Sequence, residues 1–252
     1  MSRNIWMQCG GRRNARPIRR TPWRVVEAQY INSTRKLVDS DEEQAVLERL
    51  IDGVKPSLPR GLASLHYLLF TPFRHPPLRN GSRFGARHER GIFYAAEAVE
   101  TALAEVAYYR LVFLEGTRAD LGLVETEHSA FQVSVSAEVG IDLTEPPFAE
   151  FEPLISSKLD YSASQMLGSR MRAEGVELAL YKSARARDGG INVALFEPAF
   201  DRPQPFPHFN AWVCSSTQAR VEMKEKNTLA PRRFAFPRSD YLVGDTLPSP
   251  AL

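Results

Sequence analysis

The sequence predicts a single-domain α+β fold, and three observations carry this prediction. Of the 252 residues, 43% are hydrophobic and 25% are charged, as in an ordinary globular protein. A chain of this length can bury a sufficient core without disulfides. Helical and strand-like periodicities both occur, and the strand-like segments cluster in the second half, so the order is that of a mixed α+β protein.

The first expected elements lie before residue 72. The segment 23–31 is expected to be a strand or short element that enters the core. Ser40 and Glu43 resemble a capping box ahead of an apolar stripe, which predicts a helix over 41–53. Residues 55–63 are expected to form a loop, and the apolar run 65–70, which ends near Pro72, predicts a buried strand.

A cationic loop is expected next, followed by a strand and a helix. The stretch between Pro72 and Gly91 has a loop-like composition and carries five arginines, which favours an anionic ligand. A strand is predicted at 91–96 and a helix over about 98–114. The five arginines are Arg74, Arg79, Arg83, Arg87 and Arg90.

The second half is expected to be mostly strands. Alternation of apolar and polar residues predicts a strand at 130–137, with another at 140–144. Helical periodicity returns over 162–173, with Ser162 and Gln165 as a capping box and Gly175 as the stop. Further strands are predicted at 176–183, 191–196, 210–214 and 220–226.

The net charge of +2 conceals an uneven distribution. Seven of the 32 basic residues lie in residues 1–26, which contain no acid, and this leaves 25 basic against 30 acidic residues in the remainder. We expect residues 1–22 to be a poorly ordered basic arm. An organellar transit peptide and an arm that binds nucleic acid are the alternatives.

Other function classes have little support. Cys9 and Cys214 show no ligand spacing, and the five histidines include no i, i+4 pair, so no metal site is predicted. The sequence contains no P-loop, GxGxxG, HExxH or GxSxG motif. It also lacks an apolar run long enough to span a membrane and a secretory signal, so we expect a cytoplasmic protein.

Arg83, Tyr94 and Glu105 form the candidate site, because they are spaced by eleven residues on a loop, a strand and a helix that follow one another. An arginine binds phosphate with paired hydrogen bonds, and an aromatic ring stacks on a flat heterocycle. A carboxylate can hold ribose hydroxyls and stabilise an oxocarbenium-like centre. Together they suit cleavage of the glycosidic bond of a dinucleotide, and NAD is the natural candidate because nicotinamide is a cationic leaving group.

The chain also resembles the RES domain toxins. The resemblance rests on SRFG at 82–85, FYAA at 93–96, TALAE at 101–105 and YKSARARDGGINVALF at 181–196. It covers about residues 65–200 as a RES core. Residues 23–64 then form an N-terminal part with an inserted helix, and residues 201–252 form a C-terminal extension that packs on the core.

The resemblance implies a fold similar to ADP-ribosyltransferases, with a mixed or antiparallel sheet and flanking helices. It implies an enzyme that degrades NAD by phosphorolysis or hydrolysis, or one that transfers ADP-ribose to a protein. Arg83 would bind the phosphates or ribose, Tyr94 would pack on the nicotinamide side, and Glu105 would hold the ribose. Ser183 would orient the substrate, and either Arg24 or Arg74 would be a further phosphate ligand.

The resemblance also implies a helix-turn-helix antitoxin as partner. NAD would be a substrate, with inorganic phosphate as co-substrate in phosphorolysis, and no cofactor would be tightly bound. Membrane and direct nucleic-acid contacts are not expected, and a homo-oligomer stays open. One departure from the family pattern is Phe84-Gly85 after Arg83, where an aromatic residue is often followed by asparagine. Arg185 and Asn192 either support the loop or contact substrate.

Overall fold

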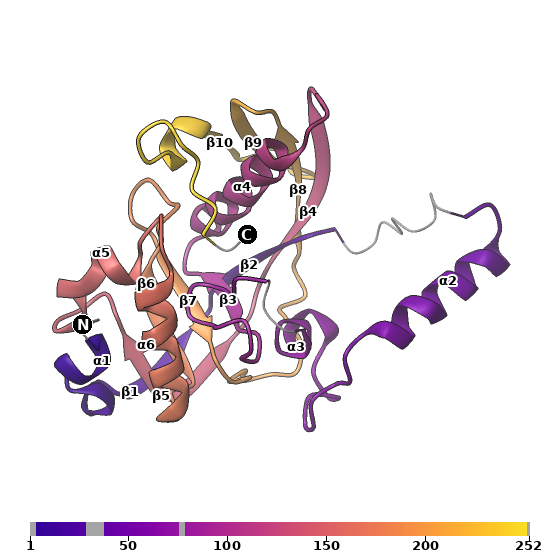
Figure 1. Ribbon diagram of the computed structural model, residues 1–252. Coiled ribbons are helices and arrows are strands. Elements are labelled where there is room, and N and C mark those ends of the chain that lie inside the picture. Colours follow the sequence, from indigo (N-terminus) through magenta and orange to yellow (C-terminus); the bar gives the residue numbers. More distant parts are fainter. Residues whose placement is uncertain (1–3, 29–37, 76–78, 251–252) are drawn as a thin grey trace.

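The computed structural model describes residues 4–28, 38–75 and 79–250 (Figure 1). Its body is a ten-stranded sheet in the order β1-β5-β6-β7-β3-β2-β4-β8-β9-β10. The β5–β6 pair is parallel and the other pairs are antiparallel, which confirms the expected mixed sheet. The strands are β1 (Arg16–Arg20), β2 (Trp23–Glu27), β3 (Phe93–Ala96), β4 (Val124–Gln132), β5 (Val135–Asp142), β6 (Leu178–Lys182), β7 (Ile191–Leu195), β8 (Asn210–Ser216), β9 (Arg220–Glu225) and β10 (Arg233–Pro237).

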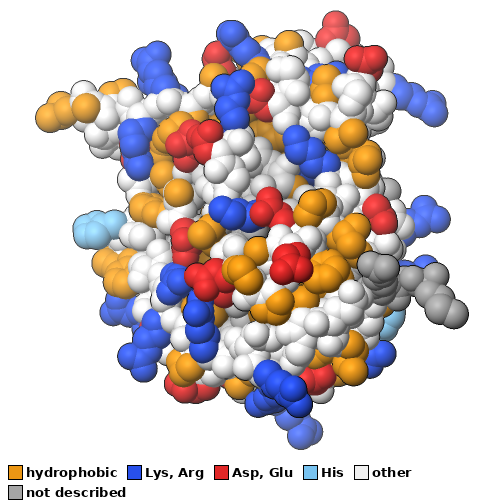
Figure 2. Space-filling view, turned by 90° about the vertical axis from the view of Figure 1, so that its left-hand side faces the viewer, with side chains coloured by type: hydrophobic (Ala, Val, Ile, Leu, Met, Phe, Trp, Pro, Cys, Tyr) orange, Lys and Arg blue, Asp and Glu red, His pale blue; other side chains and the backbone are white. Residues whose placement is uncertain are grey.

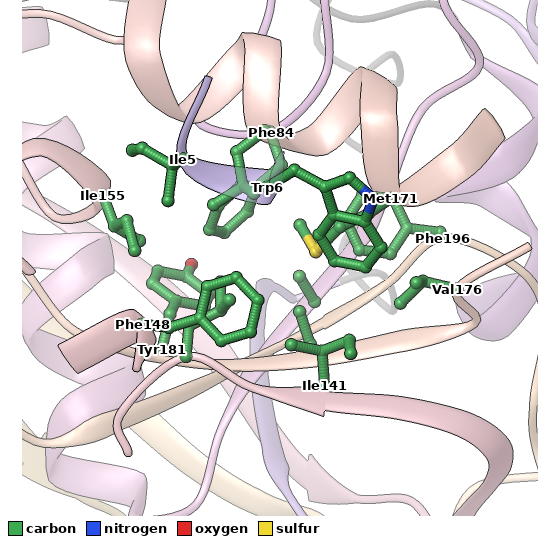
Figure 3. Close-up of a cluster of buried hydrophobic side chains, with 14 of the residues drawn as sticks. Ile5, Trp6, Phe84, Ile141, Phe148, Ile155, Met171, Val176, Tyr181 and Phe196 are labelled. Carbon is green, nitrogen blue, oxygen red and sulfur yellow. The ribbon is translucent and has the colours of Figure 1, made fainter. Parts of the chain in front are cut away.

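Helices cover both faces of this sheet. The apolar residues of α1 and α6 pack with one face of β5, β6 and β7, whereas α3 packs with the opposite face (Figures 1 and 3). α4 packs over β8 and β9. The helices are α1 (Ile5–Gln8), α2 (Asp41–Val54), α3 (Tyr67–Arg74), α4 (Val99–Gly116), α5 (Glu152–Ile155) and α6 (Ser162–Ala173), with short 3-10 turns η1 (Gly11–Asn14), η3 (Phe148–Phe151) and η4 (Arg238–Tyr241).

The sheet is interrupted near its middle, between β2 and β3. These two strands are paired only at Trp23 and Ala96, whereas β2 pairs with β4 along all five of its residues, Trp23–Glu27. Side chains alternate between faces along a strand. Tyr94 and Ala96 therefore lie on the face that α4 and α6 cover, while Phe93 packs into the core on the α3 side. Where β2 and β3 diverge, the sheet is therefore open on the side of α4.

The N-terminal segment is part of the fold, so the expectation of a poorly ordered arm over residues 1–22 is wrong for residues 4–22. Ile5 and Trp6 are 3% and 1% exposed and belong to the cluster of Figure 3, and the Trp6 Nε1 donates to Glu174 at 2.7 Å. β1 pairs with β5 through Ile18, which is also buried. The apolar residues between the arginines outweigh the basic composition, because their burial drives the segment onto the body.

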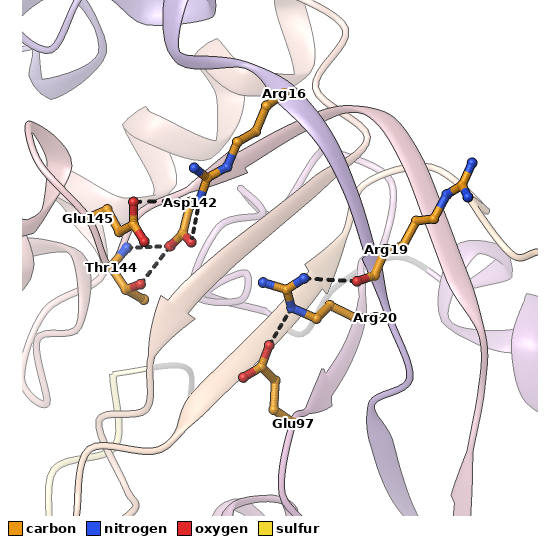
Figure 4. A network of polar contacts seen from close by, with 7 residues as sticks. All are labelled: Arg16, Arg19, Arg20, Glu97, Asp142, Thr144 and Glu145. Carbon is orange, nitrogen blue, oxygen red and sulfur yellow. Dashed lines mark hydrogen bonds and ion pairs between the residues drawn. The ribbon is translucent and has the colours of Figure 1, made fainter.

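The arginines of this segment are partly neutralised by the body (Figure 4). Arg16 lies 3.1 Å from the Asp142 carboxylate, and Arg20 lies 2.6 Å from that of Glu97. Figure 2 shows basic and acidic side chains interspersed over the face that it presents. These ion pairs weaken the alternative in which a free basic arm binds nucleic acid.

We predict that Trp6→Ala lowers the free energy of unfolding by about 3–5 kcal/mol, because it removes a large side chain from a packed core. Chemical denaturation followed by circular dichroism measures this change. Met7→Ala is the matched control, since Met7 lies on the same helix but is 71% exposed. Equal stability of the Trp6 and Met7 variants would contradict a structural role for the segment.

Several element predictions are confirmed and others are wrong. The helices predicted at 41–53, 98–114 and 162–173 correspond to α2, α4 and α6. The strand predicted at 65–70 is wrong, because this segment begins α3, whose N-terminus is capped by the His66 side chain. The strand predicted at 130–137 is also wrong in its bounds, since it crosses the turn from β4 to β5, and the one at 140–144 overlaps the end of β5.

Other differences concern strands and caps. β1 and β10 were not predicted, because β1 is mostly arginine and proline and each strand has a single fully buried residue. The residue preceding α6 is Tyr161, and no side chain caps the helix, so the capping box at Ser162 is wrong. The second half of the segment expected to continue the first strand, residues 29–31, lies outside the described residues.

α2 projects from the body in Figure 1. Val46, Leu50 and Val54 of its predicted apolar stripe are 45%, 64% and 82% exposed. No helix among the described residues combines the length and apolar character needed to cross a membrane.

Candidate active site

A cavity of about 220 Å³ opens where β2 and β3 diverge beneath α4. Charged and polar side chains from several separate segments line it, together with aromatic rings. Arg24 comes from β2, Arg83 from the loop before β3, Tyr94 from β3 and Glu105 from α4; Tyr161 and Asn192 also line it. The three residues spaced by eleven in the sequence therefore lie around one cavity.

The loop that carries Arg83 is held in place by Tyr94. The Tyr94 Oη lies 2.9 Å from the Ser82 Oγ and accepts from the Phe84 amide at 3.1 Å. The Gln165 side chain of α6 donates to the Ser82 carbonyl oxygen at 3.0 Å. The backbone on both sides of Arg83 is thus fixed. The sequence suggested a stacking role for Tyr94 and gave no indication of this anchoring role.

A close approach of α6 to this loop requires a glycine. A Cβ atom at Gly168 would lie 1.9 Å from the Phe84 carbonyl oxygen. No side chain fits there, because real Cβ contacts with backbone atoms are never this short. The loop and α6 therefore meet at backbone distance, and this places Phe84 in the core and Arg83 at the cavity.

Arg83 presents a buried positive charge. It is 8% exposed, and its Nη1 donates to the carbonyl oxygens of Ile155 and Ser157, both at 3.0 Å. The guanidinium lies 4.6 Å from the centre of the Tyr161 ring. Among the described residues no carboxylate lies within ion-pair distance of Arg83, so its charge is available to an anionic ligand.

Arg24 is the second cation of the cavity. Its Nη1 donates to the Tyr94 carbonyl oxygen at 2.6 Å, and its guanidinium lies 4.5 Å from the centre of the Phe93 ring. Its Nε is buried without a hydrogen-bond partner. Burial lowers the pKa of Arg24 to about 10, so the side chain remains charged at neutral pH.

Of the two candidates for the first arginine, the geometry favours Arg24. Arg74 is not among the residues that line the cavity, and its Nε donates to the Pro56 carbonyl oxygen. The cationic loop as a whole does not face the cavity either. Arg79 and Arg87 are exposed, and Arg90 lies 3.2 Å from the Glu197 carboxylate, so Arg83 is the arginine of this loop that lines the cavity.

Glu105 is oriented by two buried side chains. Its Oε1 accepts from the Ser183 Oγ and from the Asn192 Nδ2, both at 2.7 Å. Ser183 and Asn192 are 6% and 2% exposed. Both bonds go to one oxygen, so Oε2 has no hydrogen-bond partner among the described residues. The carboxylate is held firmly while one oxygen remains for a ligand.

Ser183 contacts Glu105 and is not among the residues that line this cavity. Its Oγ donates to Glu105 and accepts from the amides of Arg185 at 3.1 Å and Ala186 at 3.0 Å. The geometry therefore indicates that Ser183 positions Glu105, whereas the sequence predicts that Ser183 orients the substrate. For Asn192 the sequence allows either loop support or substrate contact, and the structure shows that Asn192 lines the cavity.

We predict that Ser183→Ala lowers the turnover number about tenfold, because a hydrogen bond to a charged group contributes about 1.5 kcal/mol or more. The KM for substrate should change little, since Ser183 acts through Glu105. Steady-state kinetics separates the two parameters. Ser215→Ala is the matched control, because the Ser215 Oγ donates to Glu125 at 2.9 Å on an exposed surface. A raised KM with an unchanged turnover number would contradict the positioning role.

Neutral aromatic side chains form a further part of the wall. Tyr109, Tyr161 and Tyr181 line the cavity with Tyr94. Burial raises the pKa of Tyr94 to about 12 and raises that of Tyr181 as well, so both hydroxyls stay protonated at neutral pH. The charges at the cavity are therefore those of Arg24, Arg83 and Glu105. The described residues include no group of three or more His, Cys, Asp or Glu side chains suited to a metal ion.

The central opening of the mixed sheet thus holds a buried arginine, Arg83, a half-buried arginine, Arg24, and a glutamate oriented by two hydrogen bonds. The chain belongs to the RES domain family. The model of the RES domain matches residues 58–213, which include Arg83, Tyr94, Glu105 and Ser183, whereas Arg24 lies before the match.

Solved structures also include chains that are similar to this one. A chain in the crystal structure of the M. tuberculosis MbcT-MbcA toxin-antitoxin complex matches 86% of this chain and is itself covered to 94%. The two share 15% sequence identity with a TM-score of 0.48. Among curated proteins there is no significant match.

Proposed function

We propose that this protein is the toxin of a toxin–antitoxin pair and that it cleaves the bond between nicotinamide and ribose in NAD. The observation that carries the proposal is the cavity in which Arg24, Arg83 and Glu105 meet. Membership of the RES domain family supports it, since RES domain toxins generally act on NAD. The two arginines suit the negatively charged diphosphate of NAD, and Glu105 suits the positive charge that develops when the bond breaks.

The two arginines are the proposed ligands of the diphosphate. Neither has a carboxylate partner among the described residues, and both line the cavity. Guanidinium groups bind phosphate through charge-assisted hydrogen bonds that are stronger than neutral ones. Two uncompensated arginines close together, one buried and one half-buried, are costly without a ligand, and an anionic substrate removes that cost.

Glu105 is the proposed catalytic carboxylate. As the C1′–N bond of NAD breaks, its electron pair passes to the nicotinamide nitrogen, which neutralises the pyridinium, and positive charge develops at C1′. A carboxylate held beside C1′ stabilises this oxocarbenium-like centre more than the ground state. An oxygen of inorganic phosphate or water then forms the new bond to C1′, and water loses a proton in the second case.

The size of the cavity limits which part of NAD it would enclose. Pockets that enclose a whole ligand usually have about 300–1,000 Å³. At about 220 Å³, this cavity suits the nicotinamide and its ribose, with the aromatic wall of Tyr94, Tyr161 and Tyr181 beside them. The adenosine half would then lie outside, beyond the arginines.

Incubation of the purified chain with NAD tests the proposal. We expect free nicotinamide to appear, measured by chromatography, in buffers with and without inorganic phosphate at equal ionic strength. A rate that rises with phosphate, together with a phosphorylated ADP-ribose product, identifies phosphorolysis, and an unchanged rate identifies hydrolysis. Labelled ADP-ribose attached to protein in a cell extract would instead identify ADP-ribosyl transfer. An intact NAD pool after long incubation would contradict NAD cleavage.

The partner in this proposal is a helix-turn-helix antitoxin in the cytoplasm. Its gene is expected beside that of the toxin. Co-expression should relieve the growth arrest that the toxin causes and should yield a stable complex on size-exclusion chromatography. Persisting growth arrest with the neighbouring gene product present would contradict this assignment of the partner.

A further inference from the structure

A second cavity, of about 410 Å³, adjoins the candidate active site through Ser183. The turn that follows β6, the segment around α5 and Asp240 of η4 line this cavity. Ser183 belongs to its wall, while the Ser183 Oγ donates to Glu105 in the wall of the first cavity. The two cavities are thus lined by different residues and are linked through one hydrogen bond.

Arg185 is the most unusual residue of the second cavity. Arg185 lines the cavity, yet it is only 3% exposed, and its guanidinium lies 3.6 Å from the centre of the Tyr108 ring. Its Nη1 is buried without a hydrogen-bond partner, and its Nη2 lies 3.5 Å from the Lys158 carbonyl oxygen, the limit of a hydrogen bond. A buried guanidinium with an unpaired nitrogen is unfavourable unless an acceptor completes it.

The neighbouring charges leave Arg185 uncompensated. Asp240 lies 3.1 Å from Arg187, and its carbonyl oxygen accepts from the Lys158 ammonium at 2.9 Å. No carboxylate lies within ion-pair distance of Arg185 among the described residues. Burial and the charge of Arg185 both lower the pKa of Lys158, as expected for two cations close together. An anion between Lys158 and Arg185 would remove this repulsion.

We propose that this second cavity is a binding site for a phosphate-class anion, held by the Arg185 guanidinium with Lys158 beside it. The role of the site in catalysis rests on the proposed function. There, the diphosphate of NAD lies on Arg24 and Arg83, so an anion beside Ser183 is either free inorganic phosphate or a phosphate group of a second nucleotide. Both sources share one chemistry, in which phosphate oxygens accept hydrogen bonds from a buried arginine.

Isothermal titration of the full chain with inorganic phosphate, and separately with ADP, tests the site without any NAD turnover. Arg185→Met should weaken anion binding about 10- to 100-fold, because it removes charge-assisted hydrogen bonds of about 1.5–3 kcal/mol. Ala186→Glu is the second variant, since Ala186 lines the cavity and the new carboxylate would compete for Arg185 in an otherwise intact site. Arg170→Met, at an exposed position on α6, is the control for the loss of one positive charge.

The outcomes separate the two sources and the two proposals. Phosphate binding that both cavity variants weaken and the control retains supports a site for free phosphate. Binding of ADP alone, weakened in the same way, supports a site for the phosphates of a nucleotide. If Arg185→Met does not fold, the anion affinity of the Ala186→Glu variant tests the site. No binding of either anion, or equal binding by the variants, would overturn the proposal, whether or not the protein cleaves NAD.

Discussion

Glu105→Gln is expected to lower the rate of nicotinamide release from NAD about 100- to 1,000-fold, the largest loss among the variants considered. A single electrostatic group aimed at charge that develops in the transition state contributes about this much. Gln preserves the shape of the side chain and retains an oxygen that can accept from Ser183 and Asn192, so the fold should persist. The substrate affinity should change much less than the turnover number, because stabilisation of the oxocarbenium-like centre acts mainly in the transition state.

The matched control for this variant is Glu100→Gln. Glu100 is an exposed glutamate in the first turn of the same helix, α4, and it does not line the cavity. Its replacement removes the same charge from the same element. Steady-state kinetics with both variants, at equal thermal stability, measures the difference. Equal loss of activity in the two variants, or none in Glu105→Gln, would refute a catalytic role for this carboxylate.

Arg83→Met is expected to reduce kcat/KM for NAD about 10- to 100-fold, mainly through a raised KM. The variant removes charge-assisted hydrogen bonds to the diphosphate, which contribute about 1.5–3 kcal/mol. Arg83→Lys should recover only part of the loss, because an ammonium cannot reproduce the planar paired donors of a guanidinium.

Two measurements separate this effect from a general loss of structure. Arg83 also donates to the carbonyl oxygens of Ile155 and Ser157, so the unfolding free energy of the variant must be measured alongside its kinetics. Arg87→Met is the control, since Arg87 is an exposed arginine of the same loop. A KM for NAD that stays at the wild-type value in a folded Arg83→Met protein would contradict phosphate binding by Arg83.

Local sequence patterns predicted much of the fold because they report local periodicity. α4 and α6 have clear apolar periodicities and were predicted within about two residues. The strand prediction for 65–70 is wrong, because six consecutive residues with few polar side chains suit a buried helix as well as a buried strand. β1 was missed for the opposite reason. One buried residue, Ile18, among arginines and a proline gives no alternation, and its pairing with β5 spans more than a hundred residues of sequence.

The candidate site was predictable where residue type and spacing carry the chemistry. Arg83, Tyr94 and Glu105 were found in this way, and the structure places them around one cavity. The contribution of Arg24 could not be decided from sequence, because it depends on the divergence of β2 from β3. The role of the Tyr94 hydroxyl depends likewise on a loop whose backbone amide and hydroxyl meet it in space.

The most direct measurement is a crystal structure of the Glu105→Gln protein with bound NAD. The nicotinamide and its ribose should lie in the cavity between β2, β3 and α4, with C1′ beside residue 105 and the diphosphate on Arg24 and Arg83. NAD bound elsewhere on the chain, or a cavity that stays without NAD at saturating concentrations, would contradict the proposed site of cleavage.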